Sequence, residues 1–90
     1  MDYRKEVREM RLKNKRMYEL TGEAGAAQGT LYEEAMKDGA LDRKTKELIG
    51  IGIGICVHCD ACIYGHVEKA VKYGATIEEI ADACKVALIM

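Results

Sequence analysis

The residues best suited to redox chemistry lie together in one octapeptide, residues 59 to 66, which reads Cys-Asp-Ala-Cys-Ile-Tyr-Gly-His. Two thiols at the CxxC spacing can close an intramolecular disulfide. His66 follows Cys62 by four residues, so on a helix its imidazole shares a face with the second thiol and can take or give the thiol proton. Tyr73 falls in the same narrow sector of the helical wheel. The spacing therefore places the two thiols and the imidazole on one side of a helix, where we expect the chemistry of the protein to occur.

Length, charge and hydropathy restrict the classes of function. Ninety residues fit a single domain, and a formal net charge of -1 gives no general attraction to nucleic acid or anionic lipid. The longest apolar run, residues 48–57, is too short to span a membrane, and the charged N-terminus lacks the apolar core of a signal peptide. We expect a cytoplasmic protein with no nucleic-acid partner and no membrane partner.

The cysteines leave two chemistries open. Three of the four, at positions 56, 59 and 62, lie within seven residues, which in a reducing compartment favours redox or metal chemistry over structural crosslinking. With His58 and His66 nearby, the CxxC motif also has the ligand types of a zinc site. Cys56 and Cys84 lie in apolar stretches and are expected to be buried packing residues. His58 is either a solvated turn residue or a support for the site.

The elements that must position these residues are predicted to be helices. Residues 3–19 carry a stripe at a four-three spacing among charged residues, which predicts an amphipathic helix. Residues 21–29, rich in glycine and alanine, predict a loop. Thr30 with Glu33 is a capping-box sequence, so a short helix over 31–38 is expected next. We expect one domain over 1–90, with the N-terminal helix and loop in 1–29 and the motif-bearing core in 30–90.

The segment 47–57 is the hardest to assign, because glycines at 50, 52 and 54 alternate with isoleucines in a period that would suit a strand. We favour a buried helix, since charged residues run into it without a turn signal and the isoleucines surround the helical wheel. Asp42 can cap this helix.

Two further helices complete the predicted all-α fold. Residues 60–73 form one, ended by Gly74, and Thr76 with Glu79 is a capping box that opens the other. The chain reaches Met90 inside an apolar pattern without a cap, so we expect either more sequence or an oligomer contact there.

Glu47 completes the candidate site. If helix 47–57 folds back on helix 60–73, a residue about ten positions before the turn faces one about ten after it, which brings Glu47 beside His66. A carboxylate at the start of an apolar helix is partly desolvated and suited to relay a proton. The alternative is a surface salt bridge with Arg43, one turn earlier.

The segment from Ala40 to Met90 resembles the AhpD-like alkylhydroperoxidase branch of the carboxymuconolactone decarboxylase superfamily. The resemblance rests on ALDRKTKELI, which holds the glutamate, on CDACIYGH, and on the helix start GATIEE. It implies an all-α fold, assembly into trimers or hexamers, and thiol-dependent reduction of peroxide. We expect the CxxC motif to lie on an antiparallel helix pair and the reaction to need neither a metal nor an organic cofactor.

The resemblance also assigns roles. Cys62 matches the catalytic cysteine, Cys59 the resolving cysteine, and His66 with Glu47 the proton relay. The family's peroxidase motif has a histidine immediately before the second cysteine, where this chain has Ala61.

We therefore expect a thiol-dependent oxidoreductase that reduces hydroperoxides or exchanges disulfides and is recycled by an external dithiol. The alternatives are a gamma-carboxymuconolactone decarboxylase-like lyase, which by resemblance lacks the dithiol, and a non-enzymatic metal-binding or oligomeric module.

Overall fold

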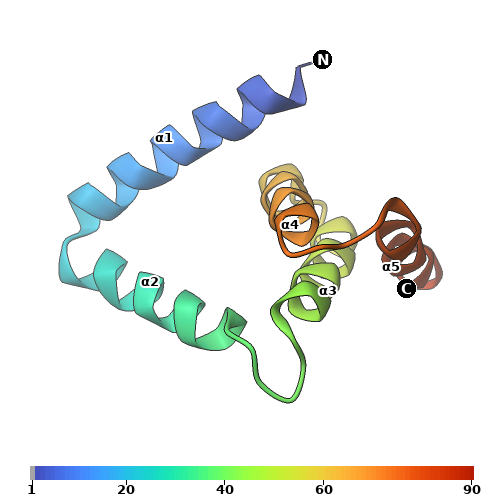
Figure 1. The fold of residues 1–90 in the computed structure, drawn as a ribbon. Coiled ribbons are helices and arrows are strands. Elements are labelled where there is room, and N and C mark those ends of the chain that lie inside the picture. Colours follow the sequence, from blue (N-terminus) through green and yellow to red (C-terminus); the bar gives the residue numbers. More distant parts are fainter. Residues whose placement is uncertain (1) are drawn as a thin grey trace. The chain divides into compact units, whose positions relative to one another are not determined.

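The protein is all-helical over the residues that the structure, a computed structural model, describes, which are 2–90. In chain order the helices are α1 (Tyr3–Thr21), α2 (Glu23–Met36), α3 (Arg43–Cys56), α4 (Asp60–Lys72) and α5 (Ile77–Ile89), as Figure 1 shows. No strand occurs in this range, so the predicted fold class is confirmed and the strand alternative for 47–57 is wrong. The chain divides into two compact units, one ending at Lys37 and one comprising Asp38–Met90.

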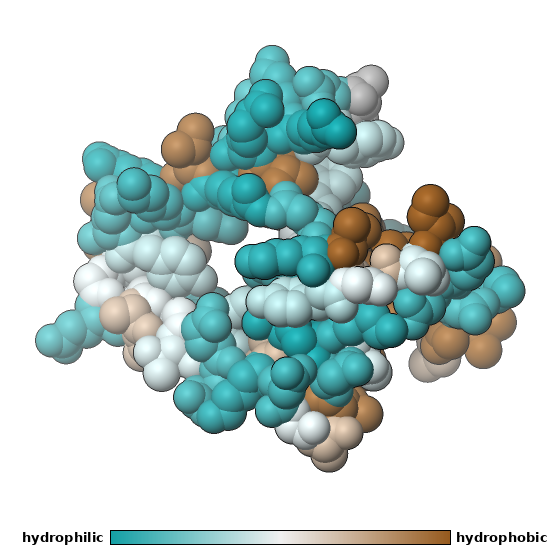
Figure 2. Space-filling model, viewed as in Figure 1, coloured by the Kyte–Doolittle hydropathy of each residue, from teal (hydrophilic) through white to brown (hydrophobic). Residues whose placement is uncertain are grey.

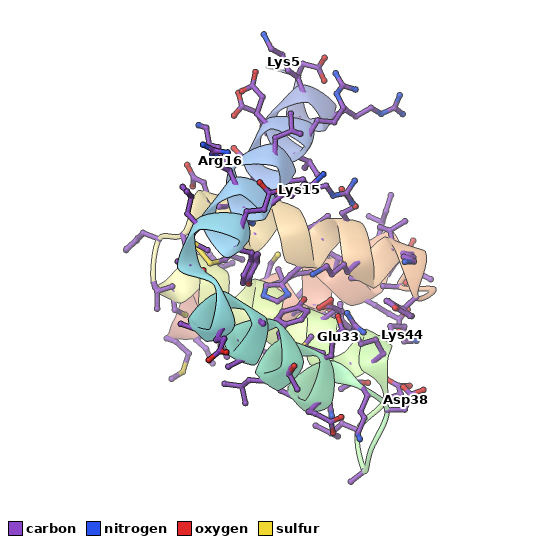
Figure 3. All side chains as sticks on the ribbon, turned by 90° about the vertical axis from the view of Figure 1, so that its left-hand side faces the viewer. Lys5, Lys15, Arg16, Glu33, Asp38 and Lys44 are labelled. Carbon is purple, nitrogen blue, oxygen red and sulfur yellow. A yellow bond between two sulfur atoms is a disulfide. The ribbon has the colours of Figure 1, made fainter. Side chains whose placement is uncertain are left out.

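The first unit consists of α1 and α2. Asp2 caps α1, because its carboxylate accepts hydrogen bonds from the backbone N–H groups of Arg4 and Lys5 at 3.1 and 3.2 Å. The helix ends at Gly22, whose φ of 58° lets the chain turn sharply into α2 (Figure 1). No residue of α1 is buried, and its basic side chains, including Lys5, Lys15 and Arg16, project from the helix in Figure 3. The predicted helix over 3–19 is confirmed and extends two residues further.

The predicted loop over 21–29 is wrong, because α2 runs through it. Alanine has the highest helix propensity, and each glycine costs only about 1 kcal/mol in a helix interior, so the alanines offset Gly25 and Gly29. The predicted capping box is also wrong: Thr30 lies inside α2, and its hydroxyl donates to the carbonyl of Ala26, 3.1 Å away. The helix expected over 31–38 is thus the second half of α2, which ends at Met36.

In the second unit, α3 packs against both α4 and α5 (Figure 1). Two aspartates cap α3: Asp42 accepts from the backbone N–H of Thr45 at 2.7 Å, as predicted, and Asp38 accepts from that of Arg43 at 2.6 Å. Figure 3 labels Asp38 and Lys44 at this end of α3. The buried apolar residues of the unit are Ile51 in α3, Ala70 in α4 and Ala87 in α5.

The alternating glycines of α3 lie against two different helices, α4 and α5. A Cβ on Gly50 would lie 2.7 Å from ring atoms of His66, and one on Gly54 would lie 3.3 Å from Cβ of Cys62, so both glycines face α4. A Cβ on Gly52 would meet only the carbonyl oxygen of Ala83 in α5, at 3.8 Å. Positions 50 and 54 are one helical turn apart and 52 lies on the other side. The period of two therefore comes from two helix interfaces.

The last two helices begin where the sequence predicts, and α4 ends at Lys72, one residue before the predicted end of helix 60–73. Gly74, with φ at 94°, follows α4, and at α5 Thr76 accepts from the backbone N–H of Glu79 while Glu79 accepts from that of Thr76, at 3.1 and 2.9 Å. Lys44 ties α5 to α3 through Glu79, with Nζ 2.8 Å from Oε2. Their hydrogen bond raises the pKa of Lys44 and lowers the pKa of Glu79.

Apolar side chains remain exposed on α5, including Ile77, Val86, Leu88 and Ile89. Hydrophobic atoms gather on the right of Figure 2, where Figure 1 places α5. Among residues 2–90, no helix has both the length and the apolar character needed to cross a bilayer.

Candidate active site

The two cysteines of the CxxC motif form a disulfide at the N-terminus of α4. Their Cα atoms are 5.2 Å apart and their sulfur atoms are bonded. Cys59 is the N-cap of α4, and its Sγ accepts a hydrogen bond from the backbone N–H of Cys62 at 3.2 Å. Cys62 is exposed and Cys59 half-buried. The pair is therefore accessible at the corner where α3 gives way to α4.

Glu47 and His66 meet across the α3–α4 interface. The Nδ1 atom of His66 lies 3.0 Å from Oε1 of Glu47, so the contact expected from the helix geometry is present. The Glu47 side chain is 0% exposed and that of His66 is 22% exposed. Gly50 makes this possible, because a side chain there would occupy the space of the imidazole ring. The carboxylate is inside the unit while the ring reaches toward solvent.

Successive contacts along the pair show that α3 and α4 run antiparallel. Gly54 lies against Cys62, Gly50 lies against His66, and Arg43 at the start of α3 lies against Tyr73 at the end of α4. Each step back along α3 is matched by a step forward along α4. The topology thus places the disulfide and the Glu47–His66 pair on the same helix interface.

Arg43 and Tyr73 belong to this constellation, although the sequence did not identify them as site residues. The Arg43 Nε atom lies 3.9 Å from Oε2 of Glu47, and its guanidinium carbon lies 4.7 Å from the centroid of the Tyr73 ring. The ion pair with Arg43, considered as an alternative to the His66 contact, therefore exists alongside it, and it is not a surface pair. Two features of the sequence could have identified these residues: Arg43 lies four residues before Glu47, and Tyr73 shares a helical sector with His66.

The two oxygens of Glu47 have different surroundings. Oε1 contacts His66, whereas Oε2 is buried and, in the part of the chain described, has no hydrogen-bond donor. Its neighbouring charge is the Arg43 guanidinium. A buried carboxylate is stabilised by such partners because it has lost its water. The site therefore holds an acid-base pair, one cation and a dithiol in oxidised form.

The other cysteines and histidine lie apart from these contacts. Cys56 is exposed at the end of α3, so the prediction that it is buried is wrong, and its Sγ lies 3.9 Å from the carbonyl oxygen of Ala87. Cys56 lines an apolar groove of about 830 Å³ between α3 and α5, and because this groove is open, the Cys56 side chain is exposed. Cys84 is half-buried and His58 is an exposed turn residue with φ at 56°. Within residues 2–90, no three His, Cys, Asp or Glu side chains are grouped so that they could hold a metal ion.

Curated relatives share the sequence over most of this chain. A protein from Paracoccus denitrificans, described as uncharacterized protein 4 in the cox locus, is 43% identical over 60 residues, which are 67% of this chain and 54% of the relative. An uncharacterized protein from Cupriavidus necator is 29% identical over 83% of this chain and 70% of its own length. The chain thus spans about half of the first relative.

Solved structures share the fold. An apo carboxymuconolactone decarboxylase family protein from Legionella pneumophila superimposes with a TM-score of 0.91 at 31% identity, over 98% of this chain and 79% of that one. A family protein from Thermotoga maritima, described as a candidate for the antioxidative response, gives a TM-score of 0.70 at 35% identity, over 76% and 70% of the two chains. The sequence profile of the family itself matches residues 22–90. The protein therefore belongs to the carboxymuconolactone decarboxylase family.

Proposed function

We propose that the protein is a thiol-dependent oxidoreductase of the AhpD-like type, which reduces hydroperoxides or exchanges disulfides. The observation that carries this proposal is the Cys59–Cys62 disulfide on the helix whose His66 binds the buried Glu47 carboxylate at 3.0 Å. A dithiol beside an acid-base pair is what proton-coupled thiol chemistry requires. The description of the Thermotoga relative as a candidate for the antioxidative response agrees with this chemistry.

In the proposed mechanism, Glu47 sets the tautomer of His66. A carboxylate only accepts hydrogen bonds, so Nδ1 of the ring must donate to Oε1, and the lone pair then lies on Nε2. Nε2 takes the proton of Cys62, which lies four residues earlier on the same helix, and the imidazolium is stabilised by the carboxylate behind it. The resulting thiolate is the nucleophile.

The proposed steps balance for a hydroperoxide substrate. The Cys62 thiolate attacks the terminal oxygen, the O–O bond breaks, and the alkoxide leaves with the proton held by His66, so that Cys62 becomes a sulfenic acid. The Cys59 thiol then attacks this sulfur, water leaves, and the disulfide seen in the structure forms. An external dithiol reduces that disulfide and is itself oxidised. With a disulfide substrate, attack by Cys62 gives a mixed disulfide, which Cys59 resolves.

Location and assembly form part of the same proposal. We place the enzyme in the cytoplasm, where cellular thiols keep the external reductant in its reduced state. We propose a homo-oligomer, a trimer or hexamer, because a chain of this length buries a modest core while leaving large apolar residues of α5 exposed. Light scattering of the purified protein measures the assembly, and a monomer at micromolar concentration would contradict this part.

The decisive experiment counts thiols. The reduced protein receives one equivalent of hydroperoxide, and free thiols are titrated in the wild type, Cys62→Ser, Cys59→Ser and Cys84→Ser. We expect the wild type and the Cys84→Ser control, which lacks a thiol outside the motif, each to lose two thiols per chain. Cys62→Ser should lose no thiols within the time that the wild type needs to lose two. Cys59→Ser should accumulate a sulfenic acid that a dimedone probe captures. Equal thiol loss in the wild type and Cys62→Ser would overturn the proposal.

The family membership itself keeps a lyase as the second candidate. A decarboxylase would convert a carboxylated lactone, and substitution of both motif cysteines would leave that rate unchanged. Metal analysis of freshly purified protein tests the zinc-binding alternative, since a stoichiometric ion retained in the reduced protein would favour it over redox chemistry.

A further inference from the structure

We propose that Arg43 is a positioning residue of this site: its guanidinium, held on the ring of Tyr73, fixes the Glu47 carboxylate so that one oxygen stays on His66. This inference deepens the proposed function, since it concerns the same acid-base pair. It rests on three observations, which are the burial of the ion pair, the unequal surroundings of the two carboxylate oxygens, and the stacking of Arg43 on a residue of the opposite helix.

The ion pair is buried to an unusual degree for the first turn of a helix. Arg43 is the first residue of α3, yet its side chain is only 14% exposed, and that of Glu47 is 0% exposed. Exposed pairs one turn apart contribute little to stability, because water screens them and the side chains lose entropy. Here both side chains are largely withdrawn from water, so solvent screens the attraction between the two charges much less.

The carboxylate is held at two points. Oε1 lies 3.0 Å from Nδ1 of His66, and Oε2 lies 3.9 Å from Nε of Arg43. Oε2 is buried and has no hydrogen-bond donor in the described chain, so the nearby guanidinium of Arg43 is the group that stabilises negative charge on this oxygen. Lys44, the next cation along α3, pairs instead with Glu79 of α5 at 2.8 Å and so does not compete. Loss of Arg43 would leave Oε2 without a charged partner.

Tyr73 holds the guanidinium in place. The guanidinium carbon of Arg43 lies 4.7 Å from the ring centroid, within the range of a cation–π contact, and Tyr73 is the C-cap of α4. The planar guanidinium can stack on a ring, whereas an ammonium group cannot do so in the same way. The end of α4 thereby orients the cation that orients Glu47. The four residues Arg43, Glu47, His66 and Tyr73 form one chain of contacts across the α3–α4 interface.

The test compares the rate of thiol loss in Arg43→Gln, Arg43→Lys and Lys44→Gln. Arg43→Gln should slow the reaction of Cys62 with hydroperoxide by about tenfold or more, since removal of one member of a buried ion pair leaves the other charge uncompensated. Arg43→Lys should recover part of the rate, because it restores the charge without the planar stack. Lys44→Gln removes a neighbouring cation and should remain within twofold of the wild type. Wild-type rates in Arg43→Gln would overturn the inference.

A second readout does not depend on activity. The ¹⁵N signals of the His66 ring report which nitrogen carries the proton, and we expect Nδ1–H in the wild type and a mixture of tautomers in Arg43→Gln. Tyr73→Phe should keep the wild-type signals because it keeps the ring, whereas Tyr73→Leu should move them toward those of Arg43→Gln. Unchanged signals in Tyr73→Leu and Arg43→Gln would refute the positioning role. If the wild type consumes no hydroperoxide or disulfide, the proposed function fails, while these spectra still decide the role of Arg43.

Discussion

Substitution of Gly50 by alanine tests the packing on which the acid-base pair depends. The new Cβ would lie 2.7 Å from the Cγ, Nδ1 and Cε1 atoms of His66. Non-bonded carbon atoms are most stable at about 3.5–4.0 Å, so the ring must move by about 1 Å. The Nδ1 to Oε1 distance, now 3.0 Å, would then pass the limit of about 3.2 Å for a good N–H···O hydrogen bond.

The energetic consequences of Gly50→Ala have opposite signs. A buried carboxylate that loses its hydrogen bond costs about 1–3 kcal/mol, whereas alanine in place of glycine stabilises a helix by about 1 kcal/mol. We expect a net loss of about 0–2 kcal/mol in the free energy of unfolding. Displacement of a catalytic group by about 1 Å can lower activity by about 100-fold, so the effect on rate should exceed the effect on stability.

Gly52→Ala is the matched control, because it makes the same change two residues away in the same helix. Its Cβ would meet only the Ala83 carbonyl oxygen at 3.8 Å, an ordinary contact. We expect this variant to gain about 1 kcal/mol in stability from helix propensity and to keep its activity. Urea unfolding and the rate of thiol loss are measured for both variants. If Gly50→Ala also gained stability and kept the wild-type rate, the described packing of His66 on α3 would be refuted.

Three further predictions follow from the contacts of α3, α4 and α5. Glu47→Gln should lower the rate of thiol oxidation by about 10²-fold or more, because an amide cannot relay a proton, and a wild-type rate would remove Glu47 from the mechanism. The Lys44–Glu79 pair should stabilise the unit across neutral pH. The pKa of Glu79 is lowered from 4.5 in the folded protein, so the stabilisation is lost as the pH falls through the pKa that Glu79 has in the folded state. The pKa of Lys44 is raised from 10.5, so the stabilisation is also lost as the pH rises through the pKa that Lys44 has in the folded state. The difference in urea midpoint between the wild type and Lys44→Met should therefore shrink at both extremes of pH, and a difference independent of pH would contradict the pairing. Thr76→Ala should cost about 1 kcal/mol through loss of the N-cap of α5, with no change in the CxxC reaction, and thermal unfolding measures this.

Much of the helical architecture follows from local sequence. Asp42 at the start of α3, Gly74 at the end of α4 and the Thr76–Glu79 box at α5 act within a few residues, and each occurs where the sequence predicts it. The error over 21–29 has the same local origin. Gly25 and Gly29 indicate a loop when counted singly, but helix formation is cooperative, and the run of good helix formers carries α2 through both glycines.

The proximity of Glu47 and His66 is predicted in part by the sequence and explained in full only by the tertiary structure. Counting residues back and forward from the turn predicts that they meet, because the rise of a helix is constant and α3 and α4 are antiparallel. The count does not reveal why the ring can approach so closely. That depends on Gly50, and the sequence showed the glycines only as an ambiguous alternation.

The sequence by itself determined the dithiol, the histidine one turn beyond it and the helical class, because these depend on spacing along a single element. The tertiary structure alone decided that Glu47 is fully buried, that Arg43 shares its carboxylate with His66, and that Tyr73 supports Arg43. These contacts join residues of two helices that are up to thirty positions apart in the sequence, as Arg43 and Tyr73 are. The desolvation of a group also depends on every side chain packed around it. Spacing along a chain encodes neighbours on one helix, whereas burial and charge pairing arise only when helices meet.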